Sequence, residues 1–378
     1  MRVCLAFDCL YPHTVGGGER WYRSLAEGLA GRGQHVTYLT RLLWDPQAGP
    51  GVPGVEVRAV SPAMQLYSGG RRSILLQLRF GLGVFLHLLR HAGRYDVVQT
   101  PGLHFSLLAV LAARLFRRFE LVVDWFEVWT REYWLEYLGG AAGRVGWLGQ
   151  RVMARSRHRA LCFSRLHARR LEQIGHRGKI TLVEGLSVLP VDDAEPAEAE
   201  PVVVFAGRHI PEKQAPAVVP AIALARAQVP KLRGQIFGDG PDRAEVLRLI
   251  EEYRLDDAVS APGFVPADQV RETLRGALCH LFPSRREGYG LVVVEASALG
   301  IPTIVVAGPD NAALELVEDG ENGVVAESED PQDLADAILR VHAAGPELRR
   351  STADWFRRNR QRLSLENSLD TVLGVYGR

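Results

Sequence analysis

The sequence has few cysteines and almost no net charge. Its 378 residues include four cysteines, Cys4, Cys9, Cys162 and Cys279, whose spacing does not match a metal site. Three of them lie in apolar runs typical of strands, so we expect reduced thiols in the core of a cytoplasmic protein. The formal net charge is +1. No overall field therefore favours nucleic acid as a partner.

Long apolar runs are also lacking. The run near the N-terminus is too short for a signal peptide, and no uninterrupted apolar stretch reaches the roughly eighteen residues that a membrane span needs. These absences predict a cytoplasmic protein. Contact with the inner face of a membrane stays open because Ser73 to Arg94 is apolar with scattered arginines and histidines. That segment is either an amphipathic helix on a membrane surface or an ordinary helix covering a sheet.

The length and the 47% hydrophobic content suit two domains. We expect an N-terminal domain over 1–190 and a C-terminal domain over 201–355, joined by an acidic, proline-bearing linker over 191–200. Residues 356–378 contain a last helical pattern. We predict that Leu365 to Tyr376 crosses back and packs on the N-terminal domain.

Strand patterns alternate with helical patterns in both halves, which predicts two doubly wound α/β domains with parallel sheets. The first half opens with a strand, a loop over Tyr11 to Gly18, and a helix from about Glu19 to Ala30. The expected strands are 3–7, 36–40, 55–60, 96–100, 121–124, 160–164 and 180–183 in the first half, and 202–206, 234–238, 259–263, 278–282, 303–306 and 323–325 in the second.

The stretch from Leu281 to Val306 carries the strongest chemical signal. An apolar strand runs into a charged turn, and Glu287 and Glu295 frame Gly288, Tyr289 and Gly290 at the start of an apolar helix. Unpaired N–H groups at a helix N-terminus form an anion site when glycines let a ligand approach. Glu295 lies among apolar residues, so it must meet a pocket or a partner.

This stretch resembles the E-x7-E signature of the retaining glycosyltransferases of family four. Further segments resemble that family in the correct order: the loop of Gly16 to Glu19, the Arg208 to Lys213 segment, and the runs 238–240, 263–265 and 310–323. The resemblance implies the GT-B architecture, in which two Rossmann-like α/β domains face each other across a cleft. It also implies transfer of a sugar from a nucleoside diphosphate to an acceptor hydroxyl with retention of configuration.

The resemblance assigns roles to single residues. Arg208 and Lys213 would neutralise the diphosphate, Glu287 would hold hydroxyls of the donor sugar, and Glu295 would hold the ribose diol. These groups would bind the diphosphate more tightly as it leaves the sugar. That tighter binding would stabilise the transition state. The remaining donor-binding candidates contribute mainly through the backbone: Gly16, Gly17, Val265, Gly288, Tyr289, Gly290 and Leu291.

The N-terminal half departs from the family pattern. Gln99, Thr100 and Pro101 stand where histidines are often found, and His104 is either a substitute for them near the reacting sugar or a structural histidine. Phe126 replaces another histidine, although Glu127 is retained. No D-x-D carboxylate pair is present, so we expect no essential metal and no cofactor. Among donors we expect a uridine rather than a guanosine nucleotide.

Three questions stay open at this point. The acceptor is a lipid carrier, a polysaccharide or a small natural product. The alternatives to a transferase are a non-catalytic nucleotide-sugar-binding protein, which the missing histidines favour, and a sugar-nucleotide epimerase. The aromatic segment Asp124 to Gly139 either walls an acceptor pocket or locks a loop onto the core.

Overall fold

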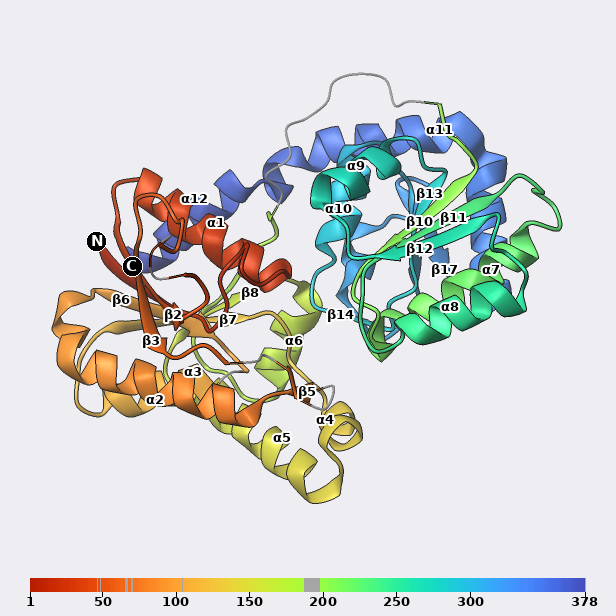
Figure 1. The fold of residues 1–378 in the computed structure, drawn as a ribbon. Coiled ribbons are helices and arrows are strands. Elements are labelled where there is room, and N and C mark those ends of the chain that lie inside the picture. The colour runs from red at the N-terminus through yellow and green to blue at the C-terminus, as the bar shows by residue number, and fades with distance from the viewer. Residues whose placement is uncertain are drawn as a thin grey trace. The chain divides into compact units, whose positions relative to one another are not determined.

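The computed structural model describes residues 1–45, 47, 49–64, 67–68, 71–103, 105–186 and 198–377, with only the backbone at 67–68 and 71–72. The chain forms two compact units (Figure 1). Unit 1 comprises Met1–Leu186 and Leu365–Arg378, and unit 2 comprises Ser187–Ser364. Most of the expected linker, residues 191–197, lies outside the described part of the chain.

Unit 1 is built on a seven-stranded parallel sheet in the order β3-β2-β1-β6-β7-β8-β9. Its strands are β1 (Arg2–Ala6), β2 (His35–Arg41), β3 (Glu56–Ser61), β6 (Val97–Pro101), β7 (Glu120–Trp125), β8 (Arg159–Cys162) and β9 (Ile180–Leu182). A separate antiparallel pair consists of β4 (Tyr67–Ser68) and β5 (Arg71–Arg72). All seven expected strands of this half are present in the sheet. The order reverses between β1 and β6, which makes that point the switch of a doubly wound sheet.

The helices of unit 1 follow the expected alternation, with one correction at α1. They are α1 (Gly17–Gly31), α2 (Ile74–His91), the 3-10 turn η1 (Ala92–Arg94), α3 (Phe105–Arg114), α4 (Arg131–Leu138), α5 (Gly140–Arg155), α6 (Arg165–Gln173) and α12 (Leu365–Tyr376). The loop expected up to Gly18 is too long. Helical bonding already begins with Arg20 N–H, which donates to the Gly16 carbonyl over 3.1 Å.

Helices α2, α3, α5 and α6 cover one face of the unit 1 sheet. Their inward side chains, among them Phe80, Leu107 and Met153, share one core cluster with Val98 and other strand residues. The segment 73–94 is therefore a covering helix of the sheet. Cys4 and Cys162 belong to the same cluster, and all four cysteines are buried free thiols.

The last helix, α12, packs with unit 1. Leu369 lies against Gly28 of α1, where an added Cβ would come within 2.4 Å of its side chain. The Ser368 hydroxyl accepts a 3.0 Å hydrogen bond from Gly185 N–H. The division from unit 2 falls after Ser364, later in the chain than the expected boundary at 356.

Unit 2 repeats the same plan with six parallel strands in the order β12-β11-β10-β13-β15-β17. The strands are β10 (Val202–Ala206), β11 (Arg233–Phe237), β12 (Val259–Gly263), β13 (Cys279–Phe282), β15 (Thr303–Val306) and β17 (Gly323–Ala326), and a short pair joins β14 (Arg286–Glu287) to β16 (Asp310–Asn311). The helices are α7 (Val218–Ala225), α8 (Arg243–Glu252), α9 (Ala267–Arg275), α10 (Leu291–Ala298) and α11 (Pro331–Leu363), with 3-10 turns η2 (Pro211–Lys213), η3 (Ala215–Ala217) and η4 (Ala312–Leu316). Here too the strand order reverses, between β10 and β13.

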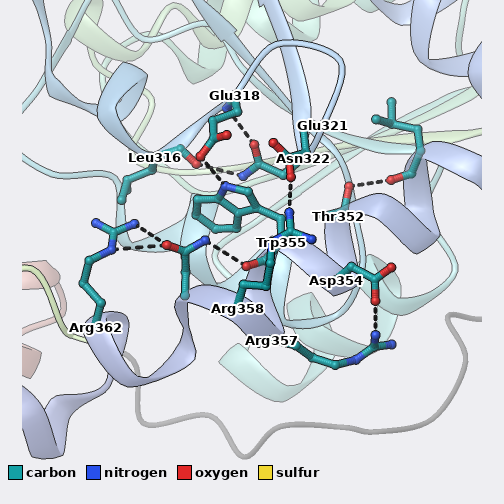
Figure 2. A network of polar contacts seen from close by, with 12 residues as sticks. Leu316, Glu318, Glu321, Asn322, Thr352, Asp354, Trp355, Arg357, Arg358 and Arg362 are labelled. Atoms are coloured by element: carbon teal, nitrogen blue, oxygen red, sulfur yellow. Dashed lines mark hydrogen bonds and ion pairs between the residues drawn. The ribbon is translucent and has the colours of Figure 1, made fainter.

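A polar network holds the second half of α11 to unit 2 (Figure 2). The helix breaks at Gly345, whose φ of 59° is left-handed. Beyond the break, Trp355 Nε1 donates to Glu318 over 2.8 Å, and Arg358 forms an ion pair with Glu321. Asn322 fixes the loop that carries both carboxylates by donating to the Leu316 carbonyl over 2.8 Å. Residues 356–363 therefore belong to unit 2 rather than to the crossing segment.

Candidate functional site

Three predicted donor-site residues of unit 2, Arg208, Lys213 and Glu287, lie where its strand order reverses. Parallel strands end at the same edge of a sheet, and ligands of doubly wound sheets bind where the order switches. Arg208 and Lys213 follow β10, and Glu287 follows β13. Strands β10 and β13 are neighbours in the sheet. A backbone hydrogen bond of 3.0 Å from Arg285 N–H to the Glu212 carbonyl ties the two segments together.

Lys213 and Glu287 form an ion pair in this place. Lys213 Nζ donates to Glu287 Oε2, and the two side chains are only 15% and 16% exposed. Lys213 Nζ also lies 4.9 Å from the ring centroid of Phe282, the last residue of β13. Sequence reasoning found both charged residues but missed their pairing, because they are 74 positions apart. The pair fixes one positive and one negative group at the strand ends.

The buried His280 responds to the same lysine. Burial, and then the positive charge of Lys213, lower the pKa of His280 to about 3. This histidine is therefore neutral at physiological pH and leaves the charge at the strand end to Lys213.

The glycine turn before α10 has the geometry that an anion site needs. Gly290 caps the helix with φ 101°, and a Cβ there would lie 2.9 Å from the Ala313 methyl group, so only glycine fits. The first N–H groups of an α-helix have no carbonyl four residues earlier within the helix. In α10 the third of them, Val293 N–H, donates to the Gly290 carbonyl over 2.9 Å. Gly288 N–H donates to Glu287 Oε1 over 3.1 Å, which orients the carboxylate beside this turn.

Glu295 lies one turn inside α10. Its side chain is half-buried on the face shared with Val292 and Leu299, both of which pack against a core cluster of unit 2. The helix therefore does have a partly accessible stripe, which Glu295 joins. This placement sets Glu295 back from the helix tip, whereas Glu287 precedes the tip.

The other unit 2 candidates lie at neighbouring strand ends. Arg208 is exposed after β10, and Val265 is half-buried after β12. Gly238 permits the close approach of β10 and β11, since a Cβ there would lie 1.8 Å from the Gly207 carbonyl oxygen. Arg208, Lys213 and Glu287 thus come from the two strands at the switch, and Val265 comes from an edge strand.

In unit 1 the predicted loop lies at that unit's own switch point. Gly16 caps α1 in an extended conformation, with φ 179°, and Gly17 is the first residue of the helix. Gly17 is exposed, and a Cβ there would meet nothing within 4 Å. His104, the candidate near the reacting sugar, lies outside the described residues.

The residues that replace the family's histidines are part of the core. Gln99 is buried, and its Nε2 donates to both carboxylate oxygens of Asp124 over 2.8 Å. Trp21 Nε1 donates to Asp124 over 3.3 Å, and the Tyr376 hydroxyl of α12 donates to Gln99 Oε1. Burial raises the pKa of Asp124 to about 6. We call Trp21, Gln99, Asp124 and Tyr376 the buried network.

The aromatic segment after β7 packs mainly on itself. The Trp129 ring contacts those of Tyr133, Trp134 and Tyr137, with centroids 4.7 to 5.1 Å away. Gln150 of α5 holds the backbone of Trp129 through hydrogen bonds of 2.8 and 3.0 Å. These contacts lock the segment to α5. Phe126 stacks on Phe163, and Glu127 accepts a 2.7 Å hydrogen bond from Trp129 Nε1.

Within the described parts of the chain, no three His, Cys, Asp or Glu side chains gather closely enough to hold a metal ion. In the same residues no helix is both long and apolar enough to cross a bilayer.

Two family models match the chain in succession. The model described as glycosyl transferases group 1 matches residues 192–355, and the glycosyl transferase 4-like domain matches residues 16–184. Together they cover most of the sequence. The chain belongs to the group 1 glycosyltransferases, and the family resemblance of the E-x7-E stretch is confirmed.

Named relatives match the chain to different extents. The chain is 34% identical over 143 residues to the exopolysaccharide phosphotransferase SCO2592 of Streptomyces coelicolor, which covers 37% of this chain and 14% of that protein. It is 26% identical to the D-inositol 3-phosphate glycosyltransferase of a Nocardioides species, over 86% of this chain and 78% of that protein. The first of these matches therefore spans only a small part of the relative.

Solved structures confirm the fold class. Sucrose-phosphate synthase from Thermosynechococcus elongatus has a TM-score of 0.78 at 21% identity, covering 99% of this chain and 98% of that one. Anabaena Alr3699/HepE, in complex with UDP and glucose, has a TM-score of 0.76 at 18% identity, covering 100% and 99%. The fold is GT-B, with two Rossmann-like α/β domains.

Proposed function

We propose that the protein is a retaining, metal-independent glycosyltransferase that moves a sugar from a UDP-sugar to an acceptor hydroxyl. The observation that carries this proposal is the Lys213–Glu287 pair beside the glycine turn of α10. It sets a fixed cation, a carboxylate and the N-terminal turn of α10 at one strand switch. Family membership and the D-inositol 3-phosphate glycosyltransferase relative support a sugar-transfer activity.

Each part of this site has a chemical role in the proposed reaction. Lys213, Arg208 and the N–H groups of 288–291 bind the diphosphate, whose negative charge grows as the sugar leaves. Glu287 binds hydroxyls of the donor sugar, and Glu295 binds the ribose diol. When the nucleotide arrives, Lys213 exchanges part of its contact with Glu287 for the phosphate oxygens.

The preference for uridine has its own support and its own test. Structures of Anabaena Alr3699/HepE with UDP share this fold. A thermal-shift screen of UDP, GDP, ADP and their sugars measures which ligand binds the folded state, because such a ligand raises the midpoint. UDP should give the largest shift, and a larger shift with GDP would overturn the preference.

Metal independence is tested with a chelator. Arg208 and Lys213 supply the positive charge that a divalent ion brings in D-x-D enzymes. Slow hydrolysis of the UDP-sugar, or its transfer to an acceptor, should continue in EDTA at an unchanged rate. Loss of turnover that manganese or magnesium restores would contradict this part of the proposal.

One observation favours a non-catalytic nucleotide-sugar-binding protein as the alternative. Gln99 stands where a histidine is often found in the family and is bonded to Asp124 in the core, so it is not available for chemistry. Binding of UDP-sugar without hydrolysis or transfer would support that alternative.

A further inference from the structure

The outer surface of α2 and α3 in unit 1 is apolar. Figure 1 shows the two helices side by side, and their inward sides belong to one core cluster. Yet large hydrophobic side chains also point outward and are exposed. We call these residues the apolar face: Ile74, Leu75, Leu78, Leu82, Leu86, Phe105, Leu108, Leu115 and Phe116.

The exposure is concentrated here. Most of the exposed large hydrophobic side chains that the structure describes lie on the apolar face or on α5, where Val145, Leu148 and Val152 are exposed as well. Helix α5 covers the same side of the sheet. Scattered exposed apolar residues are normal, but a contiguous patch marks an interaction site.

Helix α2 is apolar on both sides. Phe80, Val84 and Leu88 face the sheet, while Leu78, Leu82 and their neighbours four residues apart face solvent. The outer side also carries the exposed Arg79 and Arg90. A helix with such a mixed apolar and basic outer side suits an interface between an apolar and a polar phase.

The charges around the apolar face indicate what covers it. Residues 56–120 contain nine arginines and three acidic residues, of which Glu56 forms an ion pair with Arg58 and Asp96 forms one with Arg2. Arg79 and Arg90 are exposed on α2, and Arg118 is exposed beyond α3. An apolar surface bordered by arginines is complementary to a bilayer with anionic headgroups.

We propose that the apolar face binds the surface of a membrane containing anionic phospholipid, with its leucines and phenylalanines in the acyl boundary and its arginines at the headgroups. This contact is independent of the proposed sugar transfer, since the apolar face contains none of the proposed donor-site residues. The whole chain has a net charge of only +1. Attraction to anionic vesicles must therefore come from this local patch rather than from an overall field.

Vesicle co-sedimentation of the full chain tests the proposal. The protein should bind vesicles of phosphatidylcholine mixed with phosphatidylglycerol and bind phosphatidylcholine alone far more weakly. Raised salt should weaken the binding, because it screens the arginines. Absence of binding to the anionic vesicles at low salt would overturn the proposal.

Two double variants separate the contributions. Leu78→Gln with Leu82→Gln should weaken vesicle binding on the order of tenfold or more, since each leucine loses its burial in the acyl boundary. Arg79→Glu with Arg90→Glu should weaken it by a similar factor and reduce the salt dependence. Matched controls are Leu224→Gln with Leu247→Gln, and Arg350→Glu, all at exposed positions of unit 2.

Folding and self-association are checked on the same samples. Unchanged thermal midpoints and UDP binding show that the leucine variant is folded. Vesicle binding by this folded variant that equals wild type would overturn the proposal. Sedimentation velocity provides the other decisive outcome: a wild-type dimer that the leucine variant dissociates would assign the apolar face to a second copy of the chain instead.

Discussion

The two units share a strand plan but differ in how accessible the polar groups on their central strands are. In unit 2 the switch between β10 and β13 holds Arg208, Lys213 and Glu287, which are exposed or half-buried. In unit 1, Gln99 in the middle of β6 and Asp124 near the end of β7 are fully buried, and the Tyr376 hydroxyl donates to Gln99. The polar groups of unit 2 at this place are thus partly accessible, whereas Gln99 and Asp124 are bonded to each other in the core of unit 1.

The difference shows how two units with the same strand plan can differ in the role of their polar groups. A parallel sheet gathers polar groups at its carboxyl ends, and these groups must be hydrogen-bonded or meet a ligand. In the proposed function the groups of unit 2 meet a ligand, whereas in unit 1 a helix from the far end of the chain donates to Gln99. Substitutions at the two places should therefore fail differently, in binding and turnover for unit 2 and in stability for unit 1.

The largest expected effect is on Lys213. Lys213→Ala removes a fixed cation from the diphosphate site and leaves Glu287 without this partner. We expect turnover of the UDP-sugar to fall on the order of 100- to 1,000-fold, as when one preorganised transition-state contact is removed. The measurement is kcat and kcat/KM, with exposed Lys231→Ala as the control. Unchanged turnover in Lys213→Ala would remove this residue from the site.

The next effect concerns the stability of unit 1 as a function of pH. Asp124 has a folded-state pKa of about 6 against an ordinary 3.8. Between these values the folded state binds the proton more readily, so the free energy of unfolding falls as pH rises from 4 to 6 and stays lower above. Two pKa units correspond to about 3 kcal/mol.

Asp124→Asn removes this titration. From pH 4 to pH 7 the wild type should therefore lose up to about 3 kcal/mol of unfolding free energy relative to the variant. Buried His158, whose pKa is lowered to about 3, changes stability in the opposite direction but is present in both proteins. Six of the seven tryptophans lie in unit 1, so tryptophan fluorescence in urea follows this unit. Parallel pH profiles would contradict the prediction.

The two glutamates of unit 2 should differ from each other. Glu295→Ala should weaken the binding of free UDP and of the donor alike by ten- to a hundredfold, or roughly 1.5–3 kcal/mol, because its proposed contacts are to the ribose. Glu287→Ala should lower turnover and donor discrimination while leaving free UDP affinity nearly unchanged. Calorimetry of UDP on both variants, beside donor kinetics, makes the comparison. If both substitutions weakened the binding of free UDP equally, the E-x7-E interpretation would be wrong.

The sequence predicted the strands well because each is a continuous apolar run between turn residues. It placed the start of α1 too late, because Gly17 and Gly18 look like loop residues while the bond from Arg20 N–H to the Gly16 carbonyl already closes a helical turn. The charged residues at the unit 2 switch were predictable from the family motif. Their pairing was not, since it depends on β10 and β13 being neighbours in the sheet.

The buried network of unit 1 gave no local signal at all. Tyr376 and Gln99 are 277 positions apart, and only the return of α12 to unit 1 brings them together. Gln99 was therefore interpreted as a missing histidine, although the structure shows it as a core residue bonded to Asp124. Pairs at such separations depend on tertiary packing rather than on any periodicity in the sequence.

The smallest expected effect is that of Tyr376→Phe. The substitution removes the hydroxyl that donates to Gln99 Oε1 and keeps the ring in the core, so one buried acceptor loses its partner. Unit 1 should lose about 1–2 kcal/mol, measured by urea unfolding with tryptophan fluorescence, and amides of α12 should exchange faster. UDP affinity should not change, because the proposed donor site lies in unit 2 and is untouched. Tyr253→Phe, at an exposed position of unit 2, is the matched control. If Tyr376→Phe weakened UDP binding and left unit 1 as stable as before, the assignment of ligand binding to unit 2 and of a structural role to the buried network would be wrong.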